Sequence, residues 1–111
     1  MLLMPRDVFQ RVGGFDPAFF LYLEDSDLCY RLQQNGYGIL YVPSATAVHR
    51  WGHATRAYRF RRLLWHHRSV WRFFVKHHPS PLNYLWTGPA LAVNCLLSLA
   101  GELCTFRRDL D

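Results

Sequence analysis

The sequence is poor in cysteine and lacks the glycine-rich loop that binds phosphate groups in nucleotide-binding folds. Its three cysteines, Cys29, Cys95 and Cys104, are odd in number and have no metal-like spacing, which argues against a disulfide framework and a zinc site. No glycine-rich phosphate loop follows a predicted strand. A disordered chain is also excluded, because half of the 111 residues are hydrophobic and 16% are aromatic.

Acidic side chains become scarce after Asp27, which leaves the middle of the chain strongly basic. The formal charge is +5, and most bases lie between Arg50 and Lys76. A basic tract with aromatic residues suggests a polyanionic partner: nucleic acid, anionic lipid or a diphosphate-bearing substrate. A domain of this size has little interior for eighteen aromatic rings, so we expect some apolar surface to meet a partner, a membrane or another domain.

Local patterns predict several helices and two short strands. Apolar periodicity and capping signals predict helices over 5–12, 25–35 and 58–77. Short β-like runs predict strands over 38–42 and 45–49. A further segment, 82–101, contains no charged residue over about the length that crosses a bilayer.

The most informative stretch places three carboxylates at a predicted helix start, directly after an aromatic run. Glu24, Asp25 and Asp27 follow the sequence Phe-Phe-Leu-Tyr of residues 19–22. One interpretation is that Asp25 or Ser26 is a helix N-cap and that the other acids interact with the helix dipole. The alternative is that one carboxylate acts as a base, since an apolar surrounding raises its pKa.

The order and spacing of these motifs resemble the C-terminal part of family-2 glycosyltransferases, most closely the rhamnosyltransferase-like branch. The resemblance covers about residues 6–55 and rests on Gly-Gly-Phe-Asp at 13–16, Glu-Asp-x-Asp-Leu-Cys-x-Arg at 24–31 and Tyr-x-Pro-x-Ala at 41–45. It implies an α/β fold, in which residues 1–55 are an α-rich, acceptor-side part of a GT-A domain with short strands. A basic amphipathic helix at 56–78 and an apolar C-terminal helix at 82–104 follow.

The resemblance also implies chemical roles for individual residues. Asp25 matches the catalytic base of an inverting transfer, which takes the proton of an acceptor hydroxyl while a nucleoside diphosphate leaves from the opposite face of the sugar. Glu24 would hold the acceptor or the helix entry. Asp27 is a candidate substrate-binding residue, although it lies four residues before Arg31 and also fits a surface ion pair that fixes the helix.

Two candidate residues follow the second predicted strand. His49 is by default a packed or capping residue, but the resemblance implies that it helps to bind Mg or Mn on the donor diphosphate; Trp51 is a candidate substrate-binding residue. The Asp-x-Asp motif of such enzymes is missing, because the triplets at 25–27 and 109–111 lie in the wrong contexts. We therefore expect a missing N-terminal half or partner chain to bind the donor and most of the metal, and this chain to be inactive alone.

The basic helix and the apolar segment together suggest attachment to an anionic membrane surface, at the cytoplasmic face of the cell membrane. The alternative is a helix packed on the parent domain, followed by a buried apolar hairpin. The helical spacing of the aromatic residues favours one apolar face over base-stacking platforms, so we expect no nucleic-acid partner. The acceptor would be a glycan or a lipid-linked sugar. The alternative function is a non-catalytic, membrane-associated binding module.

Overall fold

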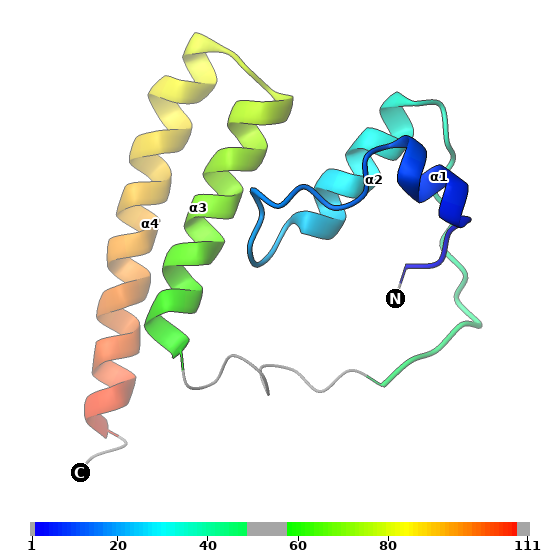
Figure 1. The fold of residues 1–111 in the computed structure, drawn as a ribbon. Helices are drawn as coiled ribbons and strands as arrows, with labels where there is room; N and C mark the ends of the chain where they lie inside the picture. The colour runs from blue at the N-terminus through cyan, green and yellow to red at the C-terminus, as the bar shows by residue number, and fades with distance from the viewer. Residues whose placement is uncertain (1, 49–57, 109–111) are drawn as a thin grey trace.

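The chain folds into helices joined by turns and extended segments. The computed structural model describes residues 2–48 and 58–108. Within them lie the helices α1 (Arg6–Arg11), α2 (Glu24–Gln34), α3 (Arg59–His77) and α4 (Pro81–Arg108) (Figure 1). The predicted helices at 5–12, 25–35 and 58–77 are confirmed to within a residue at each end. The apolar run at 82–101 is part of a single long helix that continues through Pro89.

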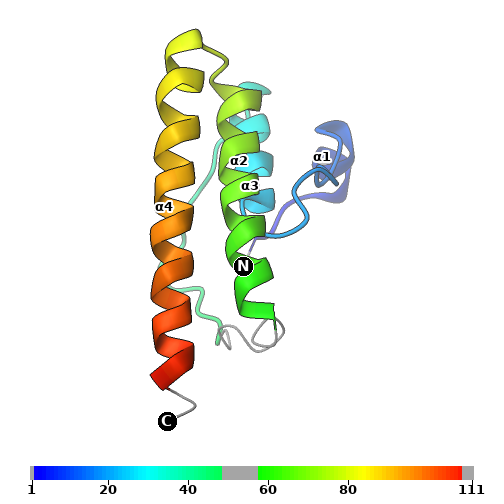
Figure 2. The ribbon, with the colours of Figure 1, turned by 90° about the vertical axis from the view of Figure 1, so that its left-hand side faces the viewer.

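α3 and α4 form an antiparallel hairpin, and they lie side by side in both ribbon views (Figures 1 and 2). The hydrogen bond between His67 Nε2 and Asn94 Oδ1 is 2.9 Å long and joins the middle of the two helices. The Trp71 ring packs against α4 at Gly88, where a Cβ atom would lie 3.4 Å from the ring, an ordinary van der Waals distance. The pair is therefore held by packing and by polar contacts along its length.

α2 packs against the opposite side of α3, near the C-terminal end of that helix. The ring of Tyr30 lies 5.9 Å from the ring of Phe73 and 4.3 Å from the ring of His77. α1 lies farther out and contacts α2 mainly through the connecting loop (Figure 1). The result is that α3 lies between α2 and α4 and contacts both of them.

The predicted strands are wrong for the part of the chain that the structure describes. Residues 38–42 and 45–48 run as extended or turn segments with no strand assignment, and His49 lies outside the described residues. A strand needs a neighbour to complete its backbone hydrogen bonds, and the described chain offers none here. Leu40 and Tyr41 are accordingly 85% and 84% exposed. The prediction of an α-rich chain is confirmed.

The core is small for a chain of this composition. Among the described residues, the buried apolar side chains are Phe19, Leu28 and Leu32. Many large apolar side chains of α4 are instead exposed, including Leu85, Trp86 and Leu97. By length and composition alone, residues Pro81–Cys104 are long and apolar enough to cross a membrane, with a mean hydropathy of 1.3 and none of that stretch buried.

Candidate active site

A strained turn, rather than a capping side chain, sets the start of α2. Tyr22 and Leu23 have φ values of 67° and 62°, a left-handed conformation that costs non-glycine residues free energy. Leu23 precedes the helix without a side-chain capping bond. The interpretation that Asp25 or Ser26 is the N-cap is therefore wrong. Backbone strain of this kind persists only where surrounding contacts hold it, and it is common at functional sites.

α3 supplies the contacts that hold this turn. The Ser69 hydroxyl is nearly buried and donates a 2.8 Å hydrogen bond to the carbonyl oxygen of Leu21. The ring of Tyr22 meets the ring of His66 edge to face at 5.4 Å between centroids. The aromatic run before the carboxylates is therefore a segment clamped on α3.

Asp25 lies in the first turn of α2 and is exposed to solvent. Its Oδ1 accepts a 2.7 Å hydrogen bond from the backbone N–H of Ser26 and a longer one, of 3.4 Å, from the Ser26 hydroxyl. In the described part of the chain nothing is bonded to Oδ2. One oxygen of the carboxylate is thus fixed by the helix start, and the other is available to a hydroxyl group that approaches from solvent.

Glu24 lies beside Asp25 and is half-buried. Its Oε2 is shielded from solvent and has no hydrogen-bond partner among the described residues. A buried carboxylate oxygen without a donor is costly, and native structures rarely leave one unpaired. The oxygen is therefore placed to accept a hydrogen bond from a donor that these residues do not supply.

Asp27 has a different environment, because its side chain is completely buried and bonded to basic side chains. Its Oδ2 accepts a 2.8 Å bond from Arg31 Nε. Its Oδ1 lies 2.7 Å from both Lys76 Nζ and His77 Nε2, at the end of α3. The predicted pairing with Arg31 is confirmed, but the pair is buried rather than on the surface. Asp27 has no exposed atom for a substrate, and it joins α2 to α3.

The Gly-Gly-Phe-Asp motif is connected to the same cluster. The guanidinium group of Arg31 donates hydrogen bonds to the carbonyl oxygens of Val12 and Gly14. Asp16 Oδ2 accepts a 2.7 Å bond from Lys76. The Gly-Gly-Phe-Asp motif and the carboxylate-rich motif of α2 therefore meet in space around Asp27.

These contacts lower the pKa values of two carboxyl groups. Burial alone would raise the pKa of Asp27, but hydrogen bonds from Lys76, His77 and Arg31 outweigh it and hold that pKa below its ordinary value of 3.8. The hydrogen bond from Lys76, and after it the one from the Ala18 N–H, lowers the pKa of Asp16. Both groups are therefore negatively charged at neutral pH and suited to structure rather than to proton transfer.

Sequence reasoning did not find the residues of α3 that serve this region. The sequence pattern assigns residues 56–78 to a basic amphipathic helix and gives Ser69, Lys76 and His77 no role at the start of α2. Ser69 contacts Leu21 across 48 residues, and His77 contacts Asp27 across 50. No local pattern signals such contacts, because the partners are far apart in the sequence.

The predicted metal and substrate residues His49 and Trp51 lie outside the described residues, so their roles stay predictions. Within residues 2–48 and 58–108, no group of three or more His, Cys, Asp or Glu side chains is placed to hold a metal ion. Asp27, the most enclosed carboxylate of the helix, is already bonded to Arg31, Lys76 and His77. The described residues therefore do not form a metal site by themselves.

Known proteins with similar sequences bear on this geometry. A family model described as "Glycosyl transferase family group 2" matches residues 1–105. "N-acetylglucosaminyl-diphospho-decaprenol L-rhamnosyltransferase" from two strains of Mycobacterium tuberculosis is 37% identical over 111 aligned positions, which cover 96% of this chain and 36% of the relative. "Rhamnosyltransferase WbbL" from Escherichia coli K12 is 40% identical over 68 positions, which cover 61% of this chain and 26% of the relative.

The chain thus spans about a third of the length of the M. tuberculosis relatives that it matches. No solved structure matches it. The matched region contains the strained turn, the exposed Asp25 and the cationic cluster around Asp27. The sequence resemblance is confirmed, and the chain belongs to the group 2 family of glycosyltransferases.

Proposed function

We propose that this chain provides the acceptor-side part of an inverting glycosyltransferase. The reaction moves a sugar from a nucleoside-diphosphate sugar to a hydroxyl group of a glycan or lipid-linked acceptor. Two relatives are named as rhamnosyltransferases, which supports rhamnose as the sugar. The fold of the complete transferase would be the GT-A α/β fold of the family, with the donor bound mainly by residues beyond those in this chain.

The single observation that carries the proposal is the contrast between Asp25 and Asp27. Both carboxylates lie in the first turn of α2. Asp27 is buried and bonded to three side chains of α2 and α3, whereas Asp25 is exposed and keeps one oxygen without a partner in the described residues. A general base must be within hydrogen-bond reach of the proton that it removes. Asp25 meets this requirement and Asp27 does not.

In the proposed step, an oxygen of Asp25 accepts the proton of the acceptor hydroxyl. The hydroxyl oxygen forms a bond to the anomeric carbon of the donor sugar, and the bond from that carbon to the diphosphate oxygen breaks on the opposite face. Glu24, whose Oε2 has no partner in the described residues, accepts a hydrogen bond from a second acceptor hydroxyl. The strained turn keeps both carboxylates in a fixed position at the helix start.

A divalent metal, Mg or Mn, belongs to the proposal only through the family. When bound, such an ion would neutralise charge on the departing diphosphate. His49 is the residue of this chain that the resemblance assigns to it, with Trp51 beside the substrate. The steps assigned to Asp25 and Glu24 do not depend on the ion.

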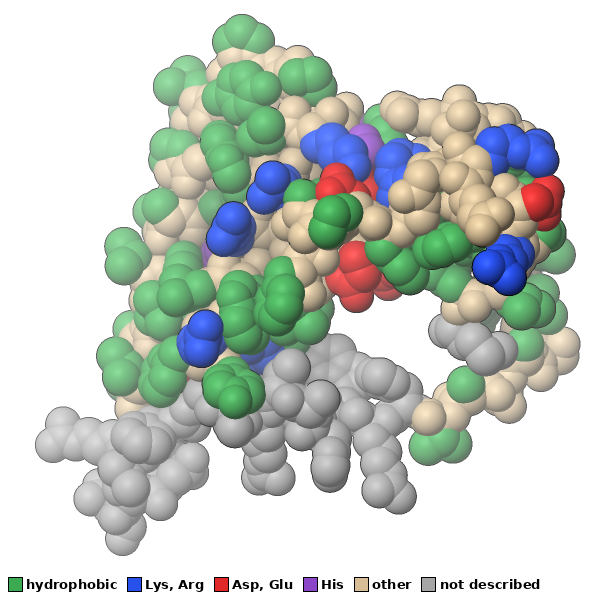
Figure 3. All heavy atoms as spheres, in the orientation of Figure 1, with side chains coloured by type: hydrophobic (Ala, Val, Ile, Leu, Met, Phe, Trp, Pro, Cys, Tyr) green, Lys and Arg blue, Asp and Glu red, His purple; other side chains and the backbone are tan. Residues whose placement is uncertain are grey.

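We also propose that the α3–α4 hairpin lies on the cytoplasmic face of the cell membrane. The exposed apolar side chains of α4 support membrane contact, and Figure 3 shows Lys and Arg side chains beside apolar ones over the hairpin. If α4 crossed the bilayer with α3 attached, the arginines of α3 would enter the hydrocarbon at a cost of about 2.5–3.5 kcal/mol each. An interfacial position in the plane of the membrane avoids that cost.

Replacement of Asp25 by asparagine tests the catalytic proposal. The variant is made in the complete transferase, which is this chain together with its nucleotide-binding half in one polypeptide or as a reconstituted pair. General-base catalysis contributes about 10²–10⁴-fold to rate, so transfer should fall by at least about 10²-fold while donor binding stays nearly unchanged. Asp7→Asn, at an exposed acid of α1, is the matched control.

Two functions are separated by this experiment. If Asp25→Asn and Asp7→Asn retain the same rate of transfer, Asp25 is not the base and the mechanism is wrong. If the complete protein binds membranes but transfers no sugar from any nucleotide-sugar donor, the non-catalytic binding module is the better description.

A further inference from the structure

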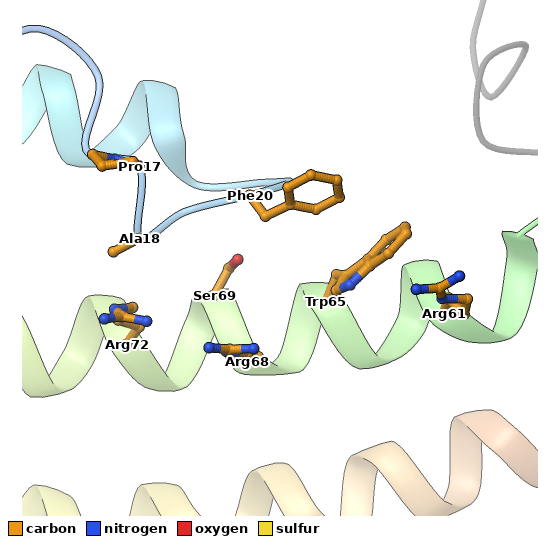
Figure 4. Close-up of a pocket in the computed structure, with 8 residues that line it drawn as sticks. All are labelled: Pro17, Ala18, Phe20, Arg61, Trp65, Arg68, Ser69 and Arg72. Carbon is orange, nitrogen blue, oxygen red and sulfur yellow. The ribbon is translucent and has the colours of Figure 1, made fainter.

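A groove rich in arginine runs between α3 and the loop formed by residues 17–20. Its volume is about 510 Å³, and Figure 4 shows its two sides. We call it the arginine groove; its lining residues are Pro17, Ala18, Phe20, Arg61, Trp65, Arg68, Ser69 and Arg72. The rings of Phe20 and Trp65 meet across it with centroids 4.9 Å apart.

The arginines of this groove carry uncompensated positive charge. Arg68 and Arg72 are both exposed and lie one helical turn apart, so their side chains are neighbours on the helix surface. Arg61 lies over the Trp65 ring, with its guanidinium carbon 5.2 Å from the ring centroid. No carboxylate among the described residues forms an ion pair with any of the three, whereas Arg31 and Lys76 do have acidic partners.

The groove is directly connected to the candidate catalytic residues. Phe20 in its wall is followed by the strained turn and then by Glu24 and Asp25. Ser69, also in the wall, forms the hydrogen bond that clamps Leu21. A ligand held in the groove is therefore bound by the same loop that positions the base.

We propose that the arginine groove binds the diphosphate group of a lipid-linked acceptor whose lipid is embedded in the membrane. This inference rests on the transferase function proposed above and names the acceptor class. Guanidinium groups bind phosphate oxygens through two parallel hydrogen bonds, which makes a pair of arginines well suited to a diphosphate. The aromatic wall of Phe20 and Trp65 provides apolar surface for the lipid carbons next to the diphosphate.

A nucleoside diphosphate matches the groove less well. Its ribose and base require hydrogen-bond acceptors as well as donors, and an acidic side chain commonly binds the ribose. The lining residues include no carboxylate and no amide side chain. The one hydroxyl among them, on Ser69, is already bonded to the Leu21 carbonyl. The apolar surface of the hairpin that carries the groove favours the lipid.

The test measures binding rather than transfer, so it is independent of catalysis. The chain is mixed with phosphatidylcholine vesicles that contain geranylgeranyl diphosphate, and with phosphatidylcholine–phosphatidylglycerol vesicles adjusted to the same surface charge. We expect binding to the diphosphate vesicles to be at least about tenfold tighter, since hydrogen bonds to charged groups typically contribute that much. Arg68→Gln with Arg72→Gln should abolish this preference.

Two further double substitutions distinguish specific binding of the diphosphate from general electrostatic attraction. Arg6→Gln with Arg11→Gln removes the same charge from exposed positions on α1 and should leave the preference intact. Arg68→Lys with Arg72→Lys keeps the charge but removes the planar guanidinium groups. This variant should lose most of the preference for the diphosphate vesicles while still binding the phosphatidylglycerol vesicles. Circular dichroism of each variant verifies that the helices are retained.

Three results would overturn the inference: equal binding to both kinds of vesicle, equal loss in the α1 control, or displacement from the vesicles by uridine diphosphate at lower concentration than by geranylgeranyl diphosphate. Any of them would leave the transferase proposal standing if Asp25→Asn still abolishes transfer. Conversely, the protein could bind the diphosphate vesicles selectively while its transfer activity does not depend on Asp25. That result would support the proposed role of the arginine groove and refute the proposal that Asp25 is the base.

Discussion

Replacing Asp27 by asparagine tests whether a buried carboxylate joins α2 to the rest of the protein. The Asp27 side chain is fully buried and contacts Arg31, Lys76 and His77. Removing one member of a buried ion pair costs about 3–5 kcal/mol, because the remaining charges lose their partner. Arg31 and Lys76 are 17% and 32% exposed, so water can partly solvate them. We therefore expect a loss near the lower limit, about 3 kcal/mol.

The measurement is the free energy of unfolding of the chain in urea, followed by circular dichroism at neutral pH. Asp7→Asn is the matched control, since the Asp7–Arg11 pair has the same spacing along its helix but is 67% and 66% exposed. Exposed pairs of this kind contribute about 0.5 kcal/mol or less. A loss in Asp27→Asn no larger than that in Asp7→Asn would refute the structural role of Asp27.

The same substitution changes the dependence of stability on pH. The pKa of Asp27 in the folded chain lies below its ordinary value of 3.8, so folding favours the ionised form. Its contribution is complete well above pH 3.8 and is lost as the pH falls through the folded pKa. The wild-type chain should lose this part of its stability in acid, whereas Asp27→Asn should be less stable at neutral pH and show a shallower acid dependence.

Two further substitutions test the packing around this region. Gly14→Ala should lower the free energy of unfolding by about 1–2 kcal/mol, because Gly14 has a φ of 65° and a Cβ atom would lie 3.3 Å from a phenylalanine ring. Gly38→Ala is the control, since a Cβ atom at Gly38 would meet nothing within 4 Å. It should change the free energy of unfolding by less than about 0.5 kcal/mol. Leu28→Ala should cost about 2–5 kcal/mol, because Leu28 is completely buried. Ile39→Ala, at a side chain that is 48% exposed, should cost much less in the same urea titration, and equal losses would contradict the assignment of the core.

The sequence predicted the helices well because their signals are local. Apolar spacing and helix-ending glycines such as Gly36 lie within a few residues of the structure that they determine. The predicted strands failed for the opposite reason: pairing at 38–42 depends on a neighbour that local pattern does not reveal, and the described chain contains none. Single-sequence patterns cannot distinguish an unpaired extended segment from a paired strand.

The candidate site could be predicted only in part, because a local motif identifies some of its residues and long-range packing determines the others. Asp25 was identified by a motif, and the structure places it at a helix start, but in an exposed position rather than in the apolar surrounding expected of a base. The burial of Asp27 and its bond to His77 arise from packing between helices far apart in the chain. The spacing of Asp27 and Arg31 predicted a surface ion pair, whereas Lys76 and His77 of α3 allow Asp27 to be buried.

The two attachments of α3, at Ser69 and at His77, lie on either side of the turn that leads into α2. A single attachment would allow a short helix to pivot, but two attachments fix both its position and its rotation about its own axis. The hairpin and the Asp25 carboxylate consequently move as one rigid unit. If the hairpin rests on a surface, the Asp25 carboxylate stays at a constant height above it, and a base at that position would reach only the hydroxyl groups at the same height.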